Sequence, residues 1–106
     1  MKRLFLTHDG RKHSRLIELD SAERTARVDG ENLPVTSQEF CLLWELSAHA
    51  SEPVSRESIL RNAWGFHAMG MTRTVDVHVQ KLRKKLGHST IETVYRCGYR
   101  LCAEAL

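Results

Sequence analysis

The chain has 106 residues, 42% hydrophobic and 27% charged, which is typical of an ordinary globular protein of one domain. It has no run of about 18 apolar residues and no apolar region of a signal peptide at its start, so we expect a cytoplasmic protein without membrane contact. Its positive charge lies in the last third: residues 71–106 have seven Lys/Arg and three Asp/Glu, a net charge of +4, whereas residues 1–70 have nine and ten, a net charge of −1.

The first third of the chain predicts a small antiparallel sheet of up to four strands over about residues 4–35. Residues 7–14 are polar and predict a loop or turn, in which His8 and His13 face solvent. The Asp29-Gly30 pair predicts a hairpin turn. We expect the strands at residues 4–6, 16–20, 25–29 and 31–35.

After residue 35 the apolar pattern changes to a helical period. Thr36 and Glu39 form a capping-box motif, followed by apolar residues at helical spacing, which predicts a helix over about 36–50. Ser55 can cap a second helix over about 55–64, which Gly65 ends. A third helix is expected over about 72–86, and two strands with Gly98 at a turn or bulge form a hairpin over about 91–103.

The third predicted helix separates apolar from basic side chains. At about 100° per residue, one narrow face contains Val75, Val79, Leu82 and Leu86, and this face is expected to pack on the core. Asp76 and Arg83 lie together on one flank. The opposite arc contains four basic residues, one histidine and no acid: Arg73, Thr74, Val77, His78, Gln80, Lys81, Lys84 and Lys85.

A charged helix face is usually only a solvated face, but such faces mix both signs of charge. An arc of one sign favours a polyanionic partner. The hairpin that follows adds Arg96 and Arg100 near its turn and tip. A basic helix followed by a basic hairpin fits one element in the DNA major groove and one at an adjacent minor groove or at phosphates.

Nearly the whole chain resembles the DNA-binding effector domain of OmpR/PhoB-type response regulators. The matching segments are VTSQEFCLLWELSAH, VSRESILRNAWG, RTVDVHVQKLRKKLG and IETVYRCGYRL. The resemblance implies an α+β fold over residues 1–106. This fold is a winged helix-turn-helix with an N-terminal antiparallel four-stranded sheet, a three-helix core and a C-terminal β-hairpin wing.

The function implied by this resemblance is sequence-specific binding of double-stranded promoter DNA by the output domain of a two-component phosphorelay regulator. It implies a head-to-tail dimer on direct repeats, and a receiver domain and sensor kinase outside this chain. RNA polymerase is a further implied partner. The alternative is a winged helix used mainly for protein contact, with its basic face on polymerase or another acidic protein.

The resemblance also implies contact residues. Phosphate-binding positions match Arg73, Thr74 and His78, while Lys84 and Lys85 extend the positive face. Positions facing bases or the groove wall match Gln80, Lys81 and Arg83; Lys81 is the first choice for guanine, and Gln80 suits adenine. The wing positions are Thr93, Tyr95, Arg96 and Arg100.

Two departures from the family pattern concern the wing. Tyr95-Arg96 replaces a common Arg-Gly pair, which shifts the wing arginine by one position. Because neighbouring side chains on a strand face opposite ways, Arg96 is expected to reach the DNA backbone, while Tyr95 replaces the minor-groove contact. Cys97 stands where Val or Thr is usual, as a small turn residue or as a redox-sensing thiol.

The loop between the second and third predicted helices lies where this family touches RNA polymerase. Its residues Phe66, His67, Met69 and Met71 either form an exposed contact patch or fold back onto the protein.

Other classes of site have no support in the sequence. The three cysteines, Cys41, Cys97 and Cys102, are odd in number, which indicates reduced thiols. No Cys-x-x-Cys or His-x-x-x-His pair predicts a metal site. No glycine-rich phosphate loop or nucleophile–base grouping occurs either, so we expect neither an enzyme nor a cofactor.

Overall fold

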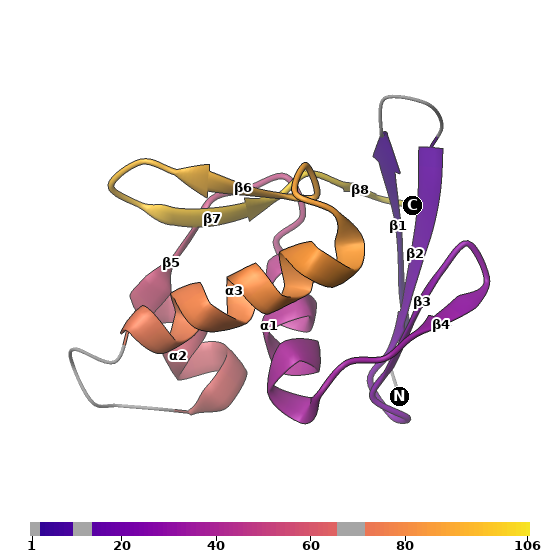
Figure 1. Cartoon of the computed structure of the whole chain (residues 1–106), viewed down its shortest axis with the longest axis horizontal. Helices are drawn as coiled ribbons and strands as arrows, with labels where there is room; N and C mark the ends of the chain where they lie inside the picture. Colours follow the sequence, from indigo (N-terminus) through magenta and orange to yellow (C-terminus); the bar gives the residue numbers. More distant parts are fainter. Residues whose placement is uncertain (1–2, 10–13, 66–71) are drawn as a thin grey trace.

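The computed structural model describes residues 3–9, 14–65 and 72–106. In Figure 1 the helices lie in the middle, a sheet from the N-terminal part lies at one end, and a hairpin runs alongside the helix labelled α3. The predicted winged helix-turn-helix is confirmed. The elements are β1 (Arg3–Asp9), β2 (Ser14–Asp20), β3 (Thr25–Val28), β4 (Glu31–Leu33), α1 (Ser37–Ala48), β5 (Val54–Ser55), α2 (Arg56–Trp64), α3 (Thr72–Leu86), β6 (Ile91–Val94), β7 (Gly98–Leu101) and β8 (Glu104–Ala105).

The N-terminal sheet has five strands rather than the predicted four, in the order β4-β3-β2-β1-β8. The added strand, β8, pairs antiparallel with Leu6 and Thr7 of β1. The Leu106 amide extends this pairing by donating to the Phe5 carbonyl at 2.9 Å. A two-residue strand has no alternation of its own to reveal it, so only its partner strand defines it.

The prediction of a loop over residues 7–14 is wrong at both ends of this range, which belong to strands. β1 extends through Asp9 and β2 begins at Ser14, so His8 lies directly opposite Arg15 in the sheet. His8 is 4% exposed, not solvated, because it faces inward and has polar partners there. His13 lies outside the described residues.

The hairpin turn predicted at Asp29-Gly30 is confirmed. Both residues have positive φ, 52° and 84°, and Val28 pairs directly with Glu31. Two central residues in the left-handed region form the turn that matches the twist of the flanking strands, and Asp-Gly is among the sequences that favour it.

The helices begin where the capping residues predict. The Thr36 hydroxyl accepts from the Glu39 amide at 3.1 Å, and the Glu39 carboxylate accepts from the Thr36 amide at 2.9 Å, which completes the capping box of α1. The Ser55 hydroxyl caps α2 by accepting from the Ser58 amide. Gly65 ends α2 in the left-handed conformation, with φ of 68°.

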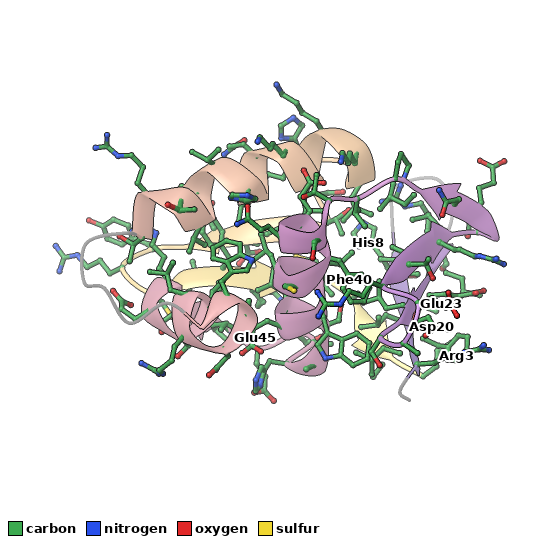
Figure 2. The ribbon with its side chains drawn as sticks, turned by 90° about the horizontal axis from the view of Figure 1, so that it is seen from below. Arg3, His8, Asp20, Glu23, Phe40 and Glu45 are labelled. Carbon is green, nitrogen blue, oxygen red and sulfur yellow. The ribbon has the colours of Figure 1, made fainter. Side chains whose placement is uncertain are left out.

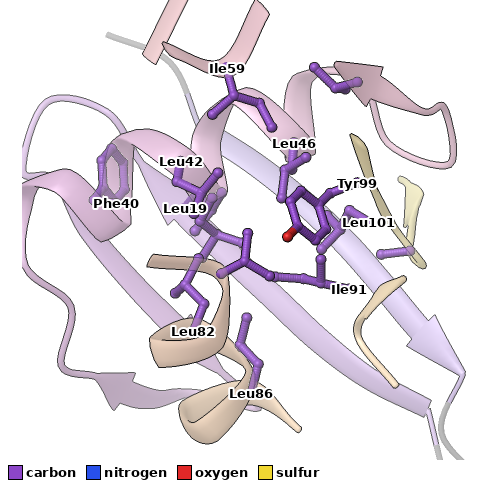
Figure 3. Close-up of a cluster of buried hydrophobic side chains, with 14 of the residues drawn as sticks. Leu19, Phe40, Leu42, Leu46, Ile59, Leu82, Leu86, Ile91, Tyr99 and Leu101 are labelled. Carbon is purple, nitrogen blue, oxygen red and sulfur yellow. The ribbon is translucent and has the colours of Figure 1, made fainter. Parts of the chain in front are cut away.

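One apolar core joins the sheet, the helices and the hairpin (Figure 3). The predicted apolar face of α3 is confirmed, because Val75, Val79, Leu82 and Leu86 are at most 1% exposed. Opposite them lie leucines of β2 and α1 and apolar residues of the hairpin. Labelled in Figure 3 are Leu19, Phe40, Leu42, Leu46, Ile59, Leu82, Leu86, Ile91, Tyr99 and Leu101. No helix among the described residues is long and apolar enough to cross a membrane.

The hairpin β6–β7 gains a third strand from β5, which lies just before α2. Gly98 was predicted at a turn or bulge; it begins β7 directly after the turn and pairs with Ser55 of β5. A Cβ atom on Gly98 would lie 2.1 Å from the Val54 carbonyl oxygen. Glycine is therefore required here by the close approach of two backbones.

We expect Gly98→Ala to lower the free energy of unfolding by roughly 1–3 kcal/mol, because the added methyl group must push β5 away from β7. Urea denaturation measures this change. Cys97→Ala, at an exposed position in the adjacent turn, is the control and should change stability by no more than about 0.5 kcal/mol. Equal stabilities of the two variants would contradict the close approach.

Candidate nucleic-acid interface

The side of α3 opposite its buried face presents an uninterrupted exposed stripe. Its members are exposed, and each lies three or four residues from another member: Arg73, Val77, Gln80, Lys81 and Lys84. We refer to these five residues as the exposed stripe. Within the described part of the chain no Asp or Glu forms an ion pair with its three cations. In Figure 2, α3 lies along one edge of the molecule, and side chains on its outer side point away from it.

One flank of α3 is held against α1 and α2. The Lys85 ammonium donates to the buried Glu39 carboxylate at 2.5 Å. The His78 Nδ1 donates to the Thr74 carbonyl at 2.8 Å, its Nε2 lies 2.9 Å from the Gln38 side-chain oxygen, and its ring centroid is 5.0 Å from that of Trp64. The predicted basic arc is therefore narrower than the sequence indicates, because Lys85 and His78 are engaged within the protein.

Glu39 is an unusual residue for a core, with 2% of its surface exposed. Burial acts to raise the pKa of this carboxyl group. The hydrogen bond from Lys85, the Thr36 amide and the charge of Lys85 act in the opposite direction, and the net effect is a lowered pKa. The same carboxylate thus caps α1 and neutralises Lys85 of α3.

The other flank of α3 faces the wing, β6–β7. The Arg83 guanidinium donates to the Ile91 carbonyl at 3.0 and 2.8 Å and to the Thr93 hydroxyl at 2.8 Å. Its central carbon also lies 5.6 Å from the centroid of the Tyr99 ring. Arg83, which the resemblance places at the bases or groove wall, here connects the helix to the wing, and Thr93 is its partner.

Asp76, the one acidic residue of α3, is neutralised on the same flank. Its carboxylate accepts from Arg56 Nε at 2.9 Å and from the Tyr99 hydroxyl at 2.5 Å. Burial first, and then the hydrogen bond and charge of Asp76, raise the pKa of the Tyr99 hydroxyl. Neither partner is apparent from the sequence, because they come from α2 and β7 and share no pattern with α3.

The tip of the wing presents an aromatic and a cationic side chain together. Tyr95 is 82% exposed, and the Arg96 guanidinium carbon lies 5.3 Å from its ring centroid. The Cys97 amide donates to the Val94 carbonyl, so Tyr95 and Arg96 are the central residues of a turn. The expectation that the two face opposite ways as strand neighbours is therefore wrong in its premise. Arg96 has φ of 60°, at the turn position that favours glycine.

The remaining predicted residues are less available. Arg100 pairs with Glu92, its direct cross-strand partner, at 2.9 Å, so its charge is locally balanced.

Cys41, Cys97 and Cys102 are free thiols. Among the residues that the structure describes, no group of three or more His, Cys, Asp or Glu could hold a metal ion. The predicted polymerase-contact residues lie outside the described residues: Phe66, His67, Met69 and Met71.

In the described ranges, three helices, a basic stripe on the third without acidic partners there, and a wing bonded to its flank define a winged-helix domain with a face suited to nucleic acid. The chain belongs to the family described as "Transcriptional regulatory protein, C terminal", which matches residues 30–101. The resemblance to OmpR/PhoB-type effector domains is thereby confirmed, and DNA-binding transcription regulation is the activity of this family.

Individual relatives agree with this assignment. The chain is 39% identical over 87 residues to the transcriptional regulatory protein CseB of Streptomyces avermitilis, covering 82% of this chain and 37% of CseB. It is 41% identical over 82 residues to CssR of Bacillus subtilis, covering 77% and 36%. It thus spans little more than a third of these curated relatives. The solved Klebsiella pneumoniae RstA DNA-binding domain in complex with the RstA box matches with a TM-score of 0.73 at 35% identity, covering 81% of this chain and 90% of that one.

The Glu39–Lys85 pair predicts a pH dependence of stability. Because folding lowers the pKa of Glu39 below its ordinary value of about 4.5, its contribution is fully present above that pH and is lost as the pH falls through the folded-state pKa. Glu39→Gln keeps a capping side chain but cannot titrate. We expect the wild type to be the more stable protein at pH 7 and this advantage to shrink toward pH 3, in urea denaturation at each pH. A constant difference across this range would contradict the assignment.

The left-handed turn at Arg96 predicts a difference between two substitutions. Arg96→Ala and Arg96→Gly both remove the guanidinium and its contact with Tyr95, but only glycine removes the cost of positive φ. We expect the glycine variant to be the more stable by about 0.5–1 kcal/mol, after allowing for its greater freedom in the unfolded chain. Thermal denaturation compares them, and equal midpoints would show that the turn carries no such cost.

Proposed function

We propose that this chain binds specific sequences in double-stranded DNA as the output domain of a two-component response regulator, with α3 in the major groove and the wing near the adjacent minor groove. The observation that carries this proposal is the exposed stripe: three cations without an acidic partner in the described structure, on a 15-residue helix. The major groove admits one α-helix, and phosphates on both sides attract its cations.

Each member of the exposed stripe has a chemistry suited to a different contact. Lys81, near the middle, is proposed to reach guanine, and the Gln80 amide suits the edge of adenine. Arg73 and Lys84, at the two ends, are proposed to contact phosphates. Val77 was not among the contact residues expected from the sequence, but it is 47% exposed between cations and suits a thymine methyl group.

The residues on the flanks are proposed to support these contacts. His78 and Thr74 lie on the α1 side, where a phosphate of the groove edge would pass. Arg83 is proposed to act through Ile91 and Thr93 of the wing. Lys85 is proposed to act through Glu39 of α1. Both contacts fix the rotation of α3 about its own axis.

Tyr95 and Arg96 form the part of the wing that approaches the minor groove or its phosphates, because they are exposed at the tip. Arg100 is proposed to contribute less, since Glu92 already balances its charge.

The comparisons support this proposal. A structure 35% identical to this chain is that of a DNA-binding domain in complex with its DNA box, and relatives are named transcriptional regulatory proteins and response regulators. From the family we further propose a receiver domain and sensor kinase outside this chain, a head-to-tail dimer on direct repeats, RNA polymerase as a partner and a cytoplasmic location. We propose no enzymatic activity.

The test begins with selection of duplexes from a random pool, followed by affinity measurements at several salt concentrations. Lys81→Ala should relax the base preference at one position, costing about 1–3 kcal/mol on the selected sequence. Arg73→Ala should weaken binding to all sequences and reduce the log–log salt slope by about 1. Arg27→Ala, which removes the same charge from an exposed position on β3, is the matched control and should bind as the wild type does.

A different outcome would favour the alternative of a protein-contact module. If no sequence is enriched, and a polyglutamate competitor displaces duplex DNA as well as DNA itself does, then the basic stripe binds acidic partners without base recognition, and the proposed function fails.

A further inference from the structure

The short corner between α3 and the wing is held by side chains from the N-terminal sheet. This corner comprises residues 87–90, which join the end of α3 to the start of β6. Figure 1 shows that it lies at the end of α3 nearest the sheet. Because the corner is so short, its conformation sets the direction in which the wing leaves the helix.

Arg15 of β2 holds the helix side of the corner. Its guanidinium donates to the Leu86 carbonyl, one of the last carbonyls of α3, which have no partner within the helix. It also donates to the Thr90 hydroxyl at 3.0 Å, and that hydroxyl in turn donates to the same Leu86 carbonyl at 3.2 Å. Thr90 is fully buried. No acidic residue in the described ranges pairs with Arg15, so its charge faces the negative end of the α3 dipole.

His8 of β1 holds the wing side of the corner. Its Nδ1 lies 2.6 Å from the Cys102 carbonyl, which can only accept, so Nδ1 donates. A neutral ring then accepts at Nε2 from the Ser89 hydroxyl, 3.3 Å away. The Cys102 amide in turn donates to the Thr90 carbonyl at 2.8 Å, which links the end of the wing to the same corner.

These two side chains act at one place because of the sheet register. His8 and Arg15 are direct cross-strand partners, and both reach the corner from there. Arg83 ties α3 to β6 at a second point, through the Ile91 carbonyl. The wing is thus fixed to α3 at its base by the sheet and along its length by Arg83.

We propose that His8 and Arg15 are positioning residues for DNA binding: by fixing the corner, they set the wing relative to α3, so that both elements can meet the duplex at once. The inference rests on the proposed function. It assigns a role in recognition to two residues of the N-terminal sheet that need not touch DNA. Without these two side chains the base of the wing is no longer held in place. The affinity for DNA should then fall only by the amount that the wing's contacts contribute.

The experiment is a double-mutant cycle between Arg15→Ala and Arg96→Ala, with binding measured on the selected duplex. Relative to the charge-matched control Arg27→Ala, Arg15→Ala should weaken binding roughly tenfold, within the range of coupled sites. Its salt slope should fall by no more than that of Arg96→Ala, since only the wing's own phosphate contact is weakened. In the Arg96→Ala background, Arg15→Ala should cost much less. Hydrogen exchange at the Thr90 and Cys102 amides should speed up while the amides of α1 stay protected.

Several results would overturn the proposal. These are an affinity of Arg15→Ala equal to that of the control, or a loss that is the same in the Arg96→Ala background. A third is a salt slope that Arg15→Ala lowers by a further 1 or so in the Arg96→Ala background, which would mark a direct phosphate contact of Arg15. If an alanine variant unfolds, Arg15→Lys and His8→Gln replace it, because each keeps a donor for the carbonyl that the native side chain contacts. We expect these variants to lose less DNA affinity and to show the same coupling to Arg96→Ala. If the wild type itself binds no selected duplex, the proposed function fails instead.

Discussion

The rest of the structure depends on how α3 is buried. Val75, Val79, Leu82 and Leu86 are withdrawn from water, which fixes the rotation of the helix about its own axis. Once that rotation is fixed, the opposite side must face solvent, and the two flanks must meet α1 on one side and the wing on the other. The burial of this one face of α3 therefore determines which of its side chains are available to a partner.

The flanks then sort the charges of α3. Lys85 is neutralised by Glu39, and Asp76 by Arg56 and Tyr99. Arg83 donates to the Ile91 carbonyl and the Thr93 hydroxyl. What stays without such partners in the described structure is the exposed stripe, with three cations and no acid. A partly buried cation without a partner would destabilise the folded protein, because it loses contact with water. An exposed cation stays hydrated and loses little stability when it has no partner. The protein therefore gives the charged groups at its internal contacts ionic or hydrogen-bonding partners, and it leaves a surface of one sign where a polyanion fits.

The second layer of organisation links distant parts of the chain. The N-terminal sheet contributes no stripe residue, but Arg15 and His8 reach the corner where α3 turns into the wing. Arg83 joins the same two elements along their length. Helix and wing therefore form a unit whose internal geometry depends on residues far from both in sequence.

Local structure and the chemical character of the face can be predicted from the amino-acid sequence alone. Capping at Thr36 and Ser55, the Asp29-Gly30 turn and the apolar period of α3 act between near neighbours, so spacing alone reveals them. Which of the charged side chains remain without a partner depends on the fold. Whether Lys85, Arg83 or Arg100 is available depends on Glu39, Ile91 and Glu92, which lie on other elements, and whether His8 is buried depends on Cys102, 94 residues away. Helical spacing predicts the direction of a side chain from its helix axis, but hydrogen bonds and ion pairs depend on what the fold brings within about 3 Å of it.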